Sequence, residues 1–191
     1  MNKIGIFFGT DSGTTRLMAK KMAKILGDVA SKPLNVNRIS IDEMLQYDSL
    51  ILGTPSYGEG QLPGLSLGIK GGSWEELIPQ LEGADFSGKR IALYGLGNQD
   101  KYSDRFADSL FCLYEKLCAL GAVPIGSWPV EGYTFEHSKA VVDGKFVGLI
   151  LDQQNQALLS EARMKTWLEQ IGPELTGNLP LDEPLLATPE L

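Results

Sequence analysis

Short apolar runs alternate along the chain with longer segments in which apolar residues recur every three or four positions. The apolar runs predict five strands, at residues 4–8, 34–39, 49–53, 90–94 and 123–128. Helical spacing marks a segment that ends at Gly27, residues 104–120 before Gly121, and a last helix that Ser160 caps and that runs through Ile171. Alternating strands and helices are typical of an α/β domain whose parallel sheet is covered on both faces. We therefore predict a doubly wound five-stranded parallel sheet.

Between residues 126 and 151 the pattern changes to shorter pieces that resemble strands. They are interrupted by Asp143-Gly144, a dipeptide typical of a tight turn, and cover residues 131–135, 140–142 and 146–151. We predict a hairpin-rich insertion in the fifth strand, at about residues 128–148, within a single domain over residues 1–175. The remaining residues, 176–191, contain Pro180, Pro184 and Pro189 and are predicted to be a flexible C-terminal tail.

The charge balance narrows the classes of partner. Of 191 residues, 17 are Lys or Arg and 24 are Asp or Glu, so the formal net charge is -7, which disfavours binding to nucleic acid or an anionic membrane. Two cysteines, Cys112 and Cys118, are expected as core or part-buried residues on opposite sides of one helix, too far apart for a disulfide. With His137 as the single histidine, expected at the surface, they exclude a zinc site built from Cys and His. Free thiols and the lack of a long apolar run predict a cytoplasmic protein.

A loop rich in hydroxyl groups follows the first predicted strand and leads into the first helix. Ligands of open parallel sheets bind at the carboxyl ends of the strands, where the N–H groups of a helix N-terminus attract an anion. The loop lacks the lysine of a P-loop and the three glycines of a dinucleotide fingerprint, so it suits one terminal phosphate group. The alternative is that its hydroxyls only cap the helix. The candidate phosphate-binding residues are Thr10, Asp11, Ser12, Gly13, Thr14 and Thr15.

Two further loops, after the third and the fourth predicted strands, are rich in glycine and carry one tyrosine each. Two aromatic rings that flank a phosphate site can sandwich a planar ring, and glycines let backbone N–H and C=O groups reach its polar edge. Each tyrosine alone would be ordinary surface packing, but together with the phosphate loop they favour flavin mononucleotide (FMN). The candidate residues are Pro55, Ser56, Tyr57, Gly58 and Gly60 in one loop and Leu96, Gly97, Asn98, Gln99 and Tyr102 in the other.

These motifs resemble those of the flavodoxins, and specifically of the long-chain group, over residues 3–175. The phosphate motif of that family, T/S-x-T-G-x-T, is matched by Thr10, Ser12, Gly13 and Thr15, with serine in place of the middle threonine. The stretch at residues 128–151 looks like the insertion that marks the long-chain members. The resemblance implies a flavodoxin-like sheet of strand order 2-1-3-4-5 and a non-covalently bound FMN.

The resemblance also implies roles for individual residues around the flavin ring. Tyr102 lies where the family has its stacking tyrosine, and Tyr57 lies where many members carry tryptophan on the other face. Asn98 stands where relatives often have aspartate, beside the pyrimidine edge. Gly58 occupies the position whose peptide turns over in the family to accept a hydrogen bond from N5–H of the semiquinone, a movement that glycine makes sterically easy.

The implied function is that of a low-potential one-electron carrier that shuttles between semiquinone and hydroquinone. Four acidic residues near the predicted loops, Asp11, Glu59, Asp100 and Asp104, disfavour the extra negative charge of fully reduced flavin and can steer a basic partner. Residues 58–64 are similar to the branch associated with nitrogen fixation. The expected donor is a flavodoxin/ferredoxin reductase, the expected acceptor is an iron-sulfur protein such as nitrogenase reductase, and the expected state is a monomer.

Two other functions are compatible with the same fold class. An FMN-dependent NAD(P)H quinone or nitro reductase would use the same cleft, although the sequence offers no second dinucleotide site and no general acid. A response-regulator receiver shares the strand order but needs an aspartate after the third strand, where this chain has Thr54-Pro55-Ser56. We reject the receiver and keep the reductase as the alternative.

Overall fold

The computed structural model describes residues 4–10 and 13–177. A parallel sheet forms its centre, and the strands run in the order β2-β1-β3-β4-β5, with β9 also paired to β4. Every pairing in this sheet is parallel. The predicted doubly wound sheet with strand order 2-1-3-4-5 is confirmed. Its strands are β1 (Gly5–Phe8), β2 (Leu34–Asn35), β3 (Ser49–Pro55), β4 (Arg90–Leu96), β5 (Val123–Ile125) and β9 (Leu149–Leu151).

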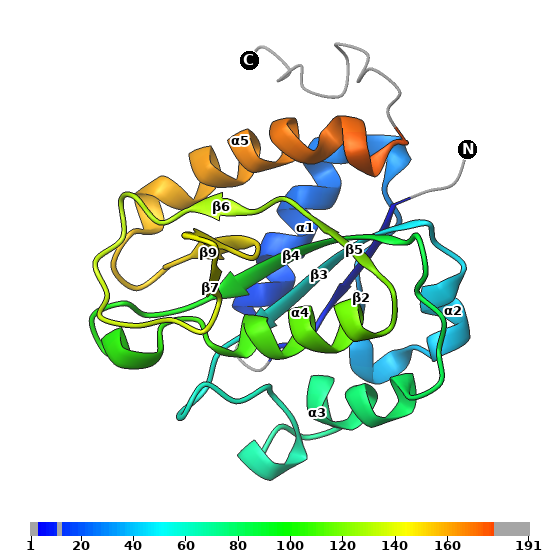
Figure 1. Ribbon diagram of the computed structural model, residues 1–191, viewed down its shortest axis with the longest axis horizontal. Helices are drawn as coiled ribbons and strands as arrows, with labels where there is room; N and C mark the ends of the chain where they lie inside the picture. The colour runs from blue at the N-terminus through cyan, green and yellow to red at the C-terminus, as the bar shows by residue number, and fades with distance from the viewer. Residues whose placement is uncertain (1–3, 11–12, 178–191) are drawn as a thin grey trace.

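Helices cover both faces of the sheet (Figure 1). On one face lie α1 (Thr14–Leu26) and α5 (Ala157–Leu175), and on the other lie α2 (Ile41–Leu45), α3 (Trp74–Leu77) and α4 (Ser109–Ala119). Short 3-10 helices complete the connections: η1 (Gly27–Val29), η2 (Val36–Arg38), η3 (Leu65–Leu67), η4 (Ile78–Leu81) and η5 (Ser103–Arg105).

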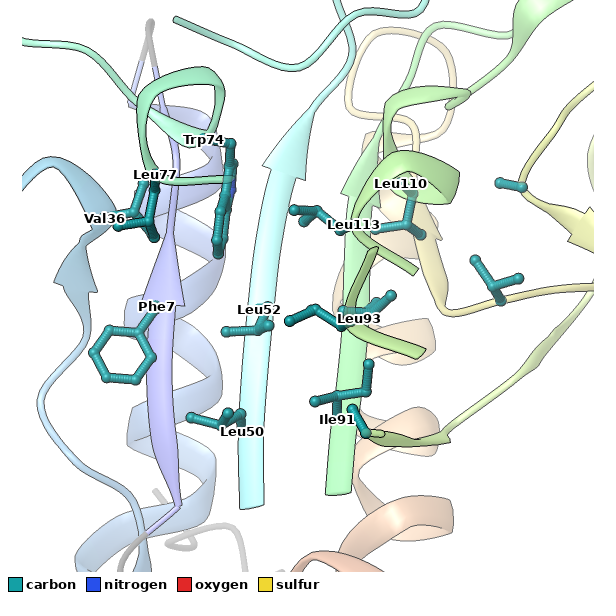
Figure 2. Packing of buried hydrophobic residues seen from close by; sticks show 14 of the residues in the cluster. Phe7, Val36, Leu50, Leu52, Trp74, Leu77, Ile91, Leu93, Leu110 and Leu113 are labelled. Atoms are coloured by element: carbon teal, nitrogen blue, oxygen red, sulfur yellow. The ribbon is translucent and has the colours of Figure 1, made fainter. Parts of the chain in front are cut away.

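The alternation of side chains along the strands explains why two separate helix layers form. In β1, Ile6 and Phe8 point into the cluster shared with α1 and α5, whereas Phe7 points into the cluster shared with α3 and α4. Leu52 and Leu93 join Phe7 on that second face, as Figure 2 shows. Because successive residues of a strand face opposite ways, an apolar run buries both faces and needs a helix layer on each.

The fifth strand is split into two parts that lie beside different stretches of β4. Strand β5 pairs with residues 90–92 and β9 pairs with residues 94–96. The chain between them forms a small antiparallel sheet of order β6-β8-β7, built from β6 (Trp128–Pro129), β7 (Val141–Val142) and β8 (Lys145–Phe146). The insertion in the fifth strand is therefore confirmed, although no strand forms at residues 131–135.

Three predicted boundaries were wrong for local reasons. The helix expected over residues 104–120 begins only at Ser109, because Ala107 adopts a positive φ of 55° that no α-helix accommodates. The second strand ends at Asn35, whose side chain accepts a hydrogen bond from the N–H of Asn37 and starts η2. Ser160 lies inside α5, which begins at Ala157, so it does not cap that helix.

The remaining expectations from the sequence concern the exposure of the cysteines and the histidine, membrane spans and the C-terminal tail. His137 is exposed as expected, but Cys112 is exposed rather than buried, and Cys118 is half-buried. Both thiols are free, and partial desolvation by neighbouring atoms raises the pKa of each. In residues 4–10 and 13–177, no helix has the length and apolar character that a membrane span requires. The predicted tail lies outside the described residues from residue 178 onward.

Candidate functional site

A cleft of about 530 Å³ opens at the carboxyl ends of β1, β3, β4 and β9. This is the edge of an open parallel sheet at which ligands bind. Segments that are far apart in the sequence meet there. The lining residues are Thr14, Pro55, Ser56, Tyr57, Gly58, Gly60, Leu96, Gly97, Asn98, Lys101, Tyr102, Arg105, Ala107, Gln153 and Gln154.

The turn between β1 and α1 presents a helix N-terminus to the cleft. Gly13, the N-cap residue, has a φ of 91°, and its N–H donates to the Thr10 hydroxyl oxygen over 3.0 Å. The first turn of α1 carries no acidic residue, which keeps the positive end of the helix dipole available to an anion. Thr14 lines the cleft. Asp11 and Ser12, predicted to bind phosphate, lie outside the described residues.

Thr15 supports this turn from below instead of lining the cleft. Its side chain is buried, and its carbonyl oxygen accepts a hydrogen bond of 2.9 Å from the Tyr94 hydroxyl of β4. Complete burial raises the pKa of the Tyr94 hydroxyl far above its usual value, so this donor stays protonated. The bond fixes the start of α1 to β4.

The loop after β3, residues 56–61 and here called the Tyr57 loop, is a compact turn. The N–H groups of Gly60 and Gln61 donate to the Tyr57 carbonyl oxygen over 2.7 and 3.1 Å. Gly58 and Gly60 have φ values of 42° and 83°, which side-chain-bearing residues rarely adopt. At Gly60, an added Cβ would also lie 2.6 Å from the Cβ of Asp108, so the turn requires glycine there.

The base of the Tyr57 loop is fastened to β4 and α4. The Ser56 N–H donates to the Leu96 carbonyl oxygen over 3.2 Å, and the Ser56 and Ser109 hydroxyl oxygens lie 2.7 Å apart. The Ser109 hydroxyl in turn donates to the Pro55 carbonyl oxygen over 2.8 Å. Ser56 therefore lines the cleft, and its side chain also connects the Tyr57 loop to α4.

The loop after β4, residues 97–102 and here called the Tyr102 loop, is organised by Asn98. The Asn98 Oδ1 accepts hydrogen bonds from the Lys101 N–H and the Asn155 Nδ2, each over 3.0 Å. The Asn98 carbonyl oxygen accepts a further bond of 2.9 Å from the Tyr102 N–H. These bonds close a tight turn that carries Tyr102 to the cleft.

Gln99 anchors the Tyr102 loop to a buried carboxylate. Both its N–H and its Nε2 donate to Asp152 Oδ2, over 3.0 and 2.9 Å, and its Oε1 accepts a 2.6 Å bond from the Thr134 N–H. Asp152 is fully buried and also accepts from the N–H groups of Gln154 and Asn155. Gln99 was predicted to contact the ligand, but the structure buries it behind the cleft wall.

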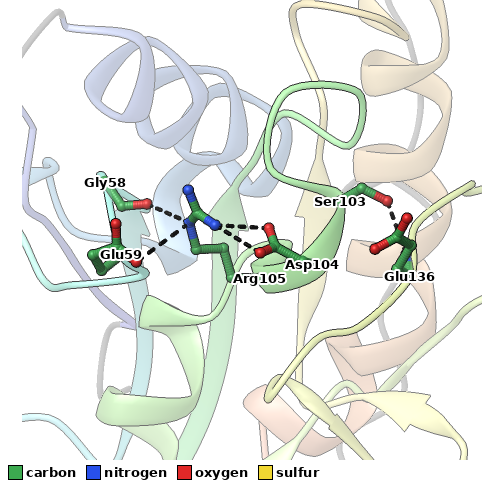
Figure 3. A network of polar contacts seen from close by, with 6 residues as sticks. All are labelled: Gly58, Glu59, Ser103, Asp104, Arg105 and Glu136. Carbon is green, nitrogen blue, oxygen red and sulfur yellow. Dashed lines mark hydrogen bonds and ion pairs between the residues drawn. The ribbon is translucent and has the colours of Figure 1, made fainter.

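Two cations lie at the cleft that the sequence patterns did not single out. Arg105, in η5, donates from Nε to the Gly58 carbonyl oxygen over 2.7 Å and from Nη1 to both oxygens of Asp104 over 2.8 Å (Figure 3). Its Nε also lies 4.0 Å from a carboxylate oxygen of Glu59. The Lys101 ammonium and the Arg105 guanidinium lie 5.2 and 5.4 Å from the centre of the Tyr102 ring.

Gln153 and Gln154 were also missed, and the sequence did contain a signal for them. They follow β9, the second part of the split fifth strand, and so lie at the same carboxyl edge as the predicted loops. Ala107, the residue with positive φ before α4, completes the lining. Across the described chain, no group of His, Cys, Asp and Glu side chains could hold a metal ion.

The family model and the related proteins that this chain matches all point to the same family. The flavodoxin family model matches residues 6–167. The chain is 50% identical over 171 residues to a flavodoxin of Klebsiella pneumoniae, an alignment that covers 90% of this chain and 97% of that protein. It is 46% identical over 172 residues to a flavodoxin of Enterobacter agglomerans, with 90% and 97% covered.

A solved structure agrees with these sequence matches. The crystal structure of Fusobacterium nucleatum flavodoxin bound to flavin mononucleotide superposes with a TM-score of 0.78 at 32% identity. The superposition covers 91% of this chain and 99% of that one.

Proposed function

This chain belongs to the flavodoxin family, and from that premise we propose that it carries single electrons on an FMN held non-covalently in the cleft. Members of this family are electron-transfer flavoproteins and not enzymes. The observation that carries the proposal is the convergence of three separately predicted loops on one cleft.

The phosphate end of FMN fits the turn before α1. The N-terminus of the 13-residue helix α1 lies there, Thr14 lines the cleft, and the Thr10 hydroxyl oxygen accepts from the Gly13 N–H at the start of the helix. Asp11 and Ser12 belong to the same proposed site by sequence. The cleft volume of about 530 Å³ is in the range of small-molecule and cofactor sites, roughly 300 to 1,000 Å³.

The flavin ring fits between the Tyr57 loop and the Tyr102 loop. Tyr57 and Tyr102 line the cleft from opposite loops, and Gly58, Gly60 and Gly97 leave backbone atoms accessible next to them. FMN supplies the redox chemistry when bound, and the protein supplies position and electric field. Asn98 also lines the cleft. Its Oδ1 already accepts hydrogen bonds from Lys101 and Asn155, so Nδ2 is the group of this side chain that we propose contacts the flavin.

We infer a low reduction potential from the carboxylates at the rim. Glu59, Asp100 and Asp104 are exposed on or next to the two tyrosine loops, and their field disfavours added negative charge on the cofactor. Lys101 and Arg105 offset part of this field, which the reasoning from sequence did not include. Three carboxylates against two cations leave the rim with a net negative charge, which lowers the reduction potential.

The same carboxylates support a basic redox partner. We propose a flavodoxin/ferredoxin reductase as donor and an iron-sulfur protein, such as nitrogenase reductase, as acceptor. Charge steering of this kind weakens as salt is added, because exposed charges are screened over about 8 Å at physiological ionic strength. Neutralising Glu59, Asp100 and Asp104 together should flatten the salt dependence of the transfer rate, and an unchanged dependence would contradict the proposal.

The experiment that tests the function itself is an absorbance spectrum followed by stepwise anaerobic reduction with dithionite. The purified protein should be yellow, and reduction should proceed in two resolved one-electron steps. A single two-electron step with steady oxidation of NAD(P)H in the absence of any partner would favour the alternative, an FMN-dependent quinone or nitro reductase. A colourless protein that takes up no added FMN would refute both.

A further inference from the structure

Arg105 connects the two tyrosine loops at the rim of the cleft. It lies just beyond the Tyr102 loop, three residues after Tyr102, and its guanidinium reaches across to the backbone of the Tyr57 loop. The bond from Nε to the Gly58 carbonyl oxygen is 2.7 Å long, typical of a strong charged donor. Figure 3 shows the Arg105 side chain between Gly58 and Glu59 on one side and Asp104 on the other.

The Tyr57 loop closes on itself at its tip. Its tip is held by bonds within itself, from Gly60 and Gln61 to the Tyr57 carbonyl oxygen. Gly58 and Glu59 are exposed. A glycine at the tip leaves the backbone free to adopt several conformations, so one firm external bond has a large share in selecting among them.

The Arg105 side chain is itself held in place. Its exposed fraction is 28%, and both carboxylate oxygens of Asp104 accept hydrogen bonds from Nη1. The Tyr102 ring lies 5.4 Å from the guanidinium carbon, within the range of a cation–π contact. A donor that is oriented in advance by a carboxylate and an aromatic ring loses less entropy when it binds a carbonyl oxygen.

We propose that Arg105 is a positioning residue that clamps the Tyr57 loop to the Tyr102 loop and so slows the release of FMN. The effect on FMN rests on the function proposed above, whereas the clamp on the loop does not. The clamp acts through the bond at Gly58, and the positive charge acts separately by compensating Glu59 and Asp104.

The test compares three variants by hydrogen exchange of the Gly60 and Gln61 amides in the purified protein. Arg105→Met removes the bond and the charge, Lys101→Met removes a charge from the same cleft without touching the Gly58 carbonyl, and Arg105→Lys keeps the charge but loses Nε. Exchange should become about fivefold faster in Arg105→Met, the loss expected for one charged hydrogen bond at a partly exposed site. It should rise similarly in Arg105→Lys and stay unchanged in Lys101→Met.

The second measurement is the rate at which FMN dissociates from the loaded protein. Arg105→Met should release FMN about fivefold faster than the parent, and Lys101→Met should do so by clearly less. Equal exchange and equal release in Arg105→Met and Lys101→Met would overturn the clamp. If the parent binds no FMN, the proposed function fails, and the exchange comparison still decides whether the clamp exists. An unchanged urea midpoint in each variant excludes general unfolding as the cause of faster exchange.

Discussion

The Tyr57 loop and the Tyr102 loop face each other across one cleft but are built in different ways. The Tyr102 loop is tied through Gln99 to the buried Asp152 and through Asn98 to Asn155. The Tyr57 loop holds itself together around the Tyr57 carbonyl oxygen and reaches the opposite wall through the guanidinium of Arg105.

This difference predicts that the Tyr102 loop is the rigid wall of the cleft and the Tyr57 loop the adjustable wall. Buried hydrogen bonds to a carboxylate are costly to break because the donors left behind find no water. An exposed hydrogen bond, such as that from Arg105 to Gly58, costs less to break, because water can replace the lost partner. A cofactor that changes charge during its function can thus be held firmly on one side while the protein adapts on the other. The predictions below test whether this contrast holds.

The largest effect is expected from Asp152→Ala. It would leave the buried N–H and Nε2 of Gln99 without an acceptor, and should lower the free energy of unfolding by about 3 kcal/mol. Urea unfolding followed by tryptophan fluorescence measures this loss. Asp100→Ala removes an exposed acid from the same loop and should change the free energy of unfolding by less than about 0.5 kcal/mol. Similar losses in both variants would mean that the Tyr102 loop is not the anchored wall.

The next effect concerns the backbone of the Tyr57 loop. Gly60→Ala places a Cβ at a φ of 83° and 2.6 Å from the Cβ of Asp108, so we expect a loss of about 2 kcal/mol and weaker FMN binding. Gly68→Ala is the matched control, because Gly68 has a φ of 80° but open space around its Cβ position. The control should lose about 1 kcal/mol from backbone strain alone and keep its FMN affinity. Isothermal titration with FMN and urea unfolding separate the two effects.

A smaller effect is expected behind the Tyr102 loop, at Tyr133. Its hydroxyl donates to the Ile150 carbonyl oxygen over 2.6 Å and accepts from Trp128 Nε1 over 3.0 Å, next to the Thr134 N–H that holds Gln99. Tyr133→Phe should cost about 1 kcal/mol at neutral pH.

The same residue gives a test in alkaline solution. Burial raises the pKa of Tyr133 from 10.0 to about 12, although the charge of Arg163 lowers it in part. Because the folded protein keeps this proton to higher pH than the unfolded chain, the resulting stability is complete below pH 10 and is lost as the pH rises to about 12. Tyr133→Phe should lose stability less steeply over that window in urea titrations. An unaltered slope would show that Tyr133 is not buried as described.

The smallest effect is expected from Glu59→Gln at the tip of the Tyr57 loop. Its carboxylate lies 4.0 Å from Arg105 Nε and is 79% exposed, so the ion pair is weak. The free energy of unfolding and the exchange of the Gly60 amide should both stay close to those of the parent. Markedly faster exchange would mean that the Glu59 ion pair holds the loop, and not the bond from Arg105 to Gly58.

The pattern of the sequence determined the fold and the positions of three of the cleft's segments. Apolar runs such as residues 49–53 have to be buried on both faces, which dictates parallel strands between two helix layers. Glycines and hydroxyls after those strands identify the ligand edge, because ligands of open parallel sheets bind at the carboxyl ends of the strands. These features are local in the chain, so a single sequence displays them.

Contacts between distant segments were decided by the tertiary structure alone. Nothing near Arg105 in the sequence indicates that its guanidinium meets the carbonyl oxygen of Gly58, 47 positions away. Likewise, the buried Asp152, 53 positions away in the chain, binds the Gln99 side chain, which does not line the cleft. Such pairings follow from how β3, β4 and β9 lie side by side, because a hydrogen bond depends on distance in space and leaves no periodic trace in the chain.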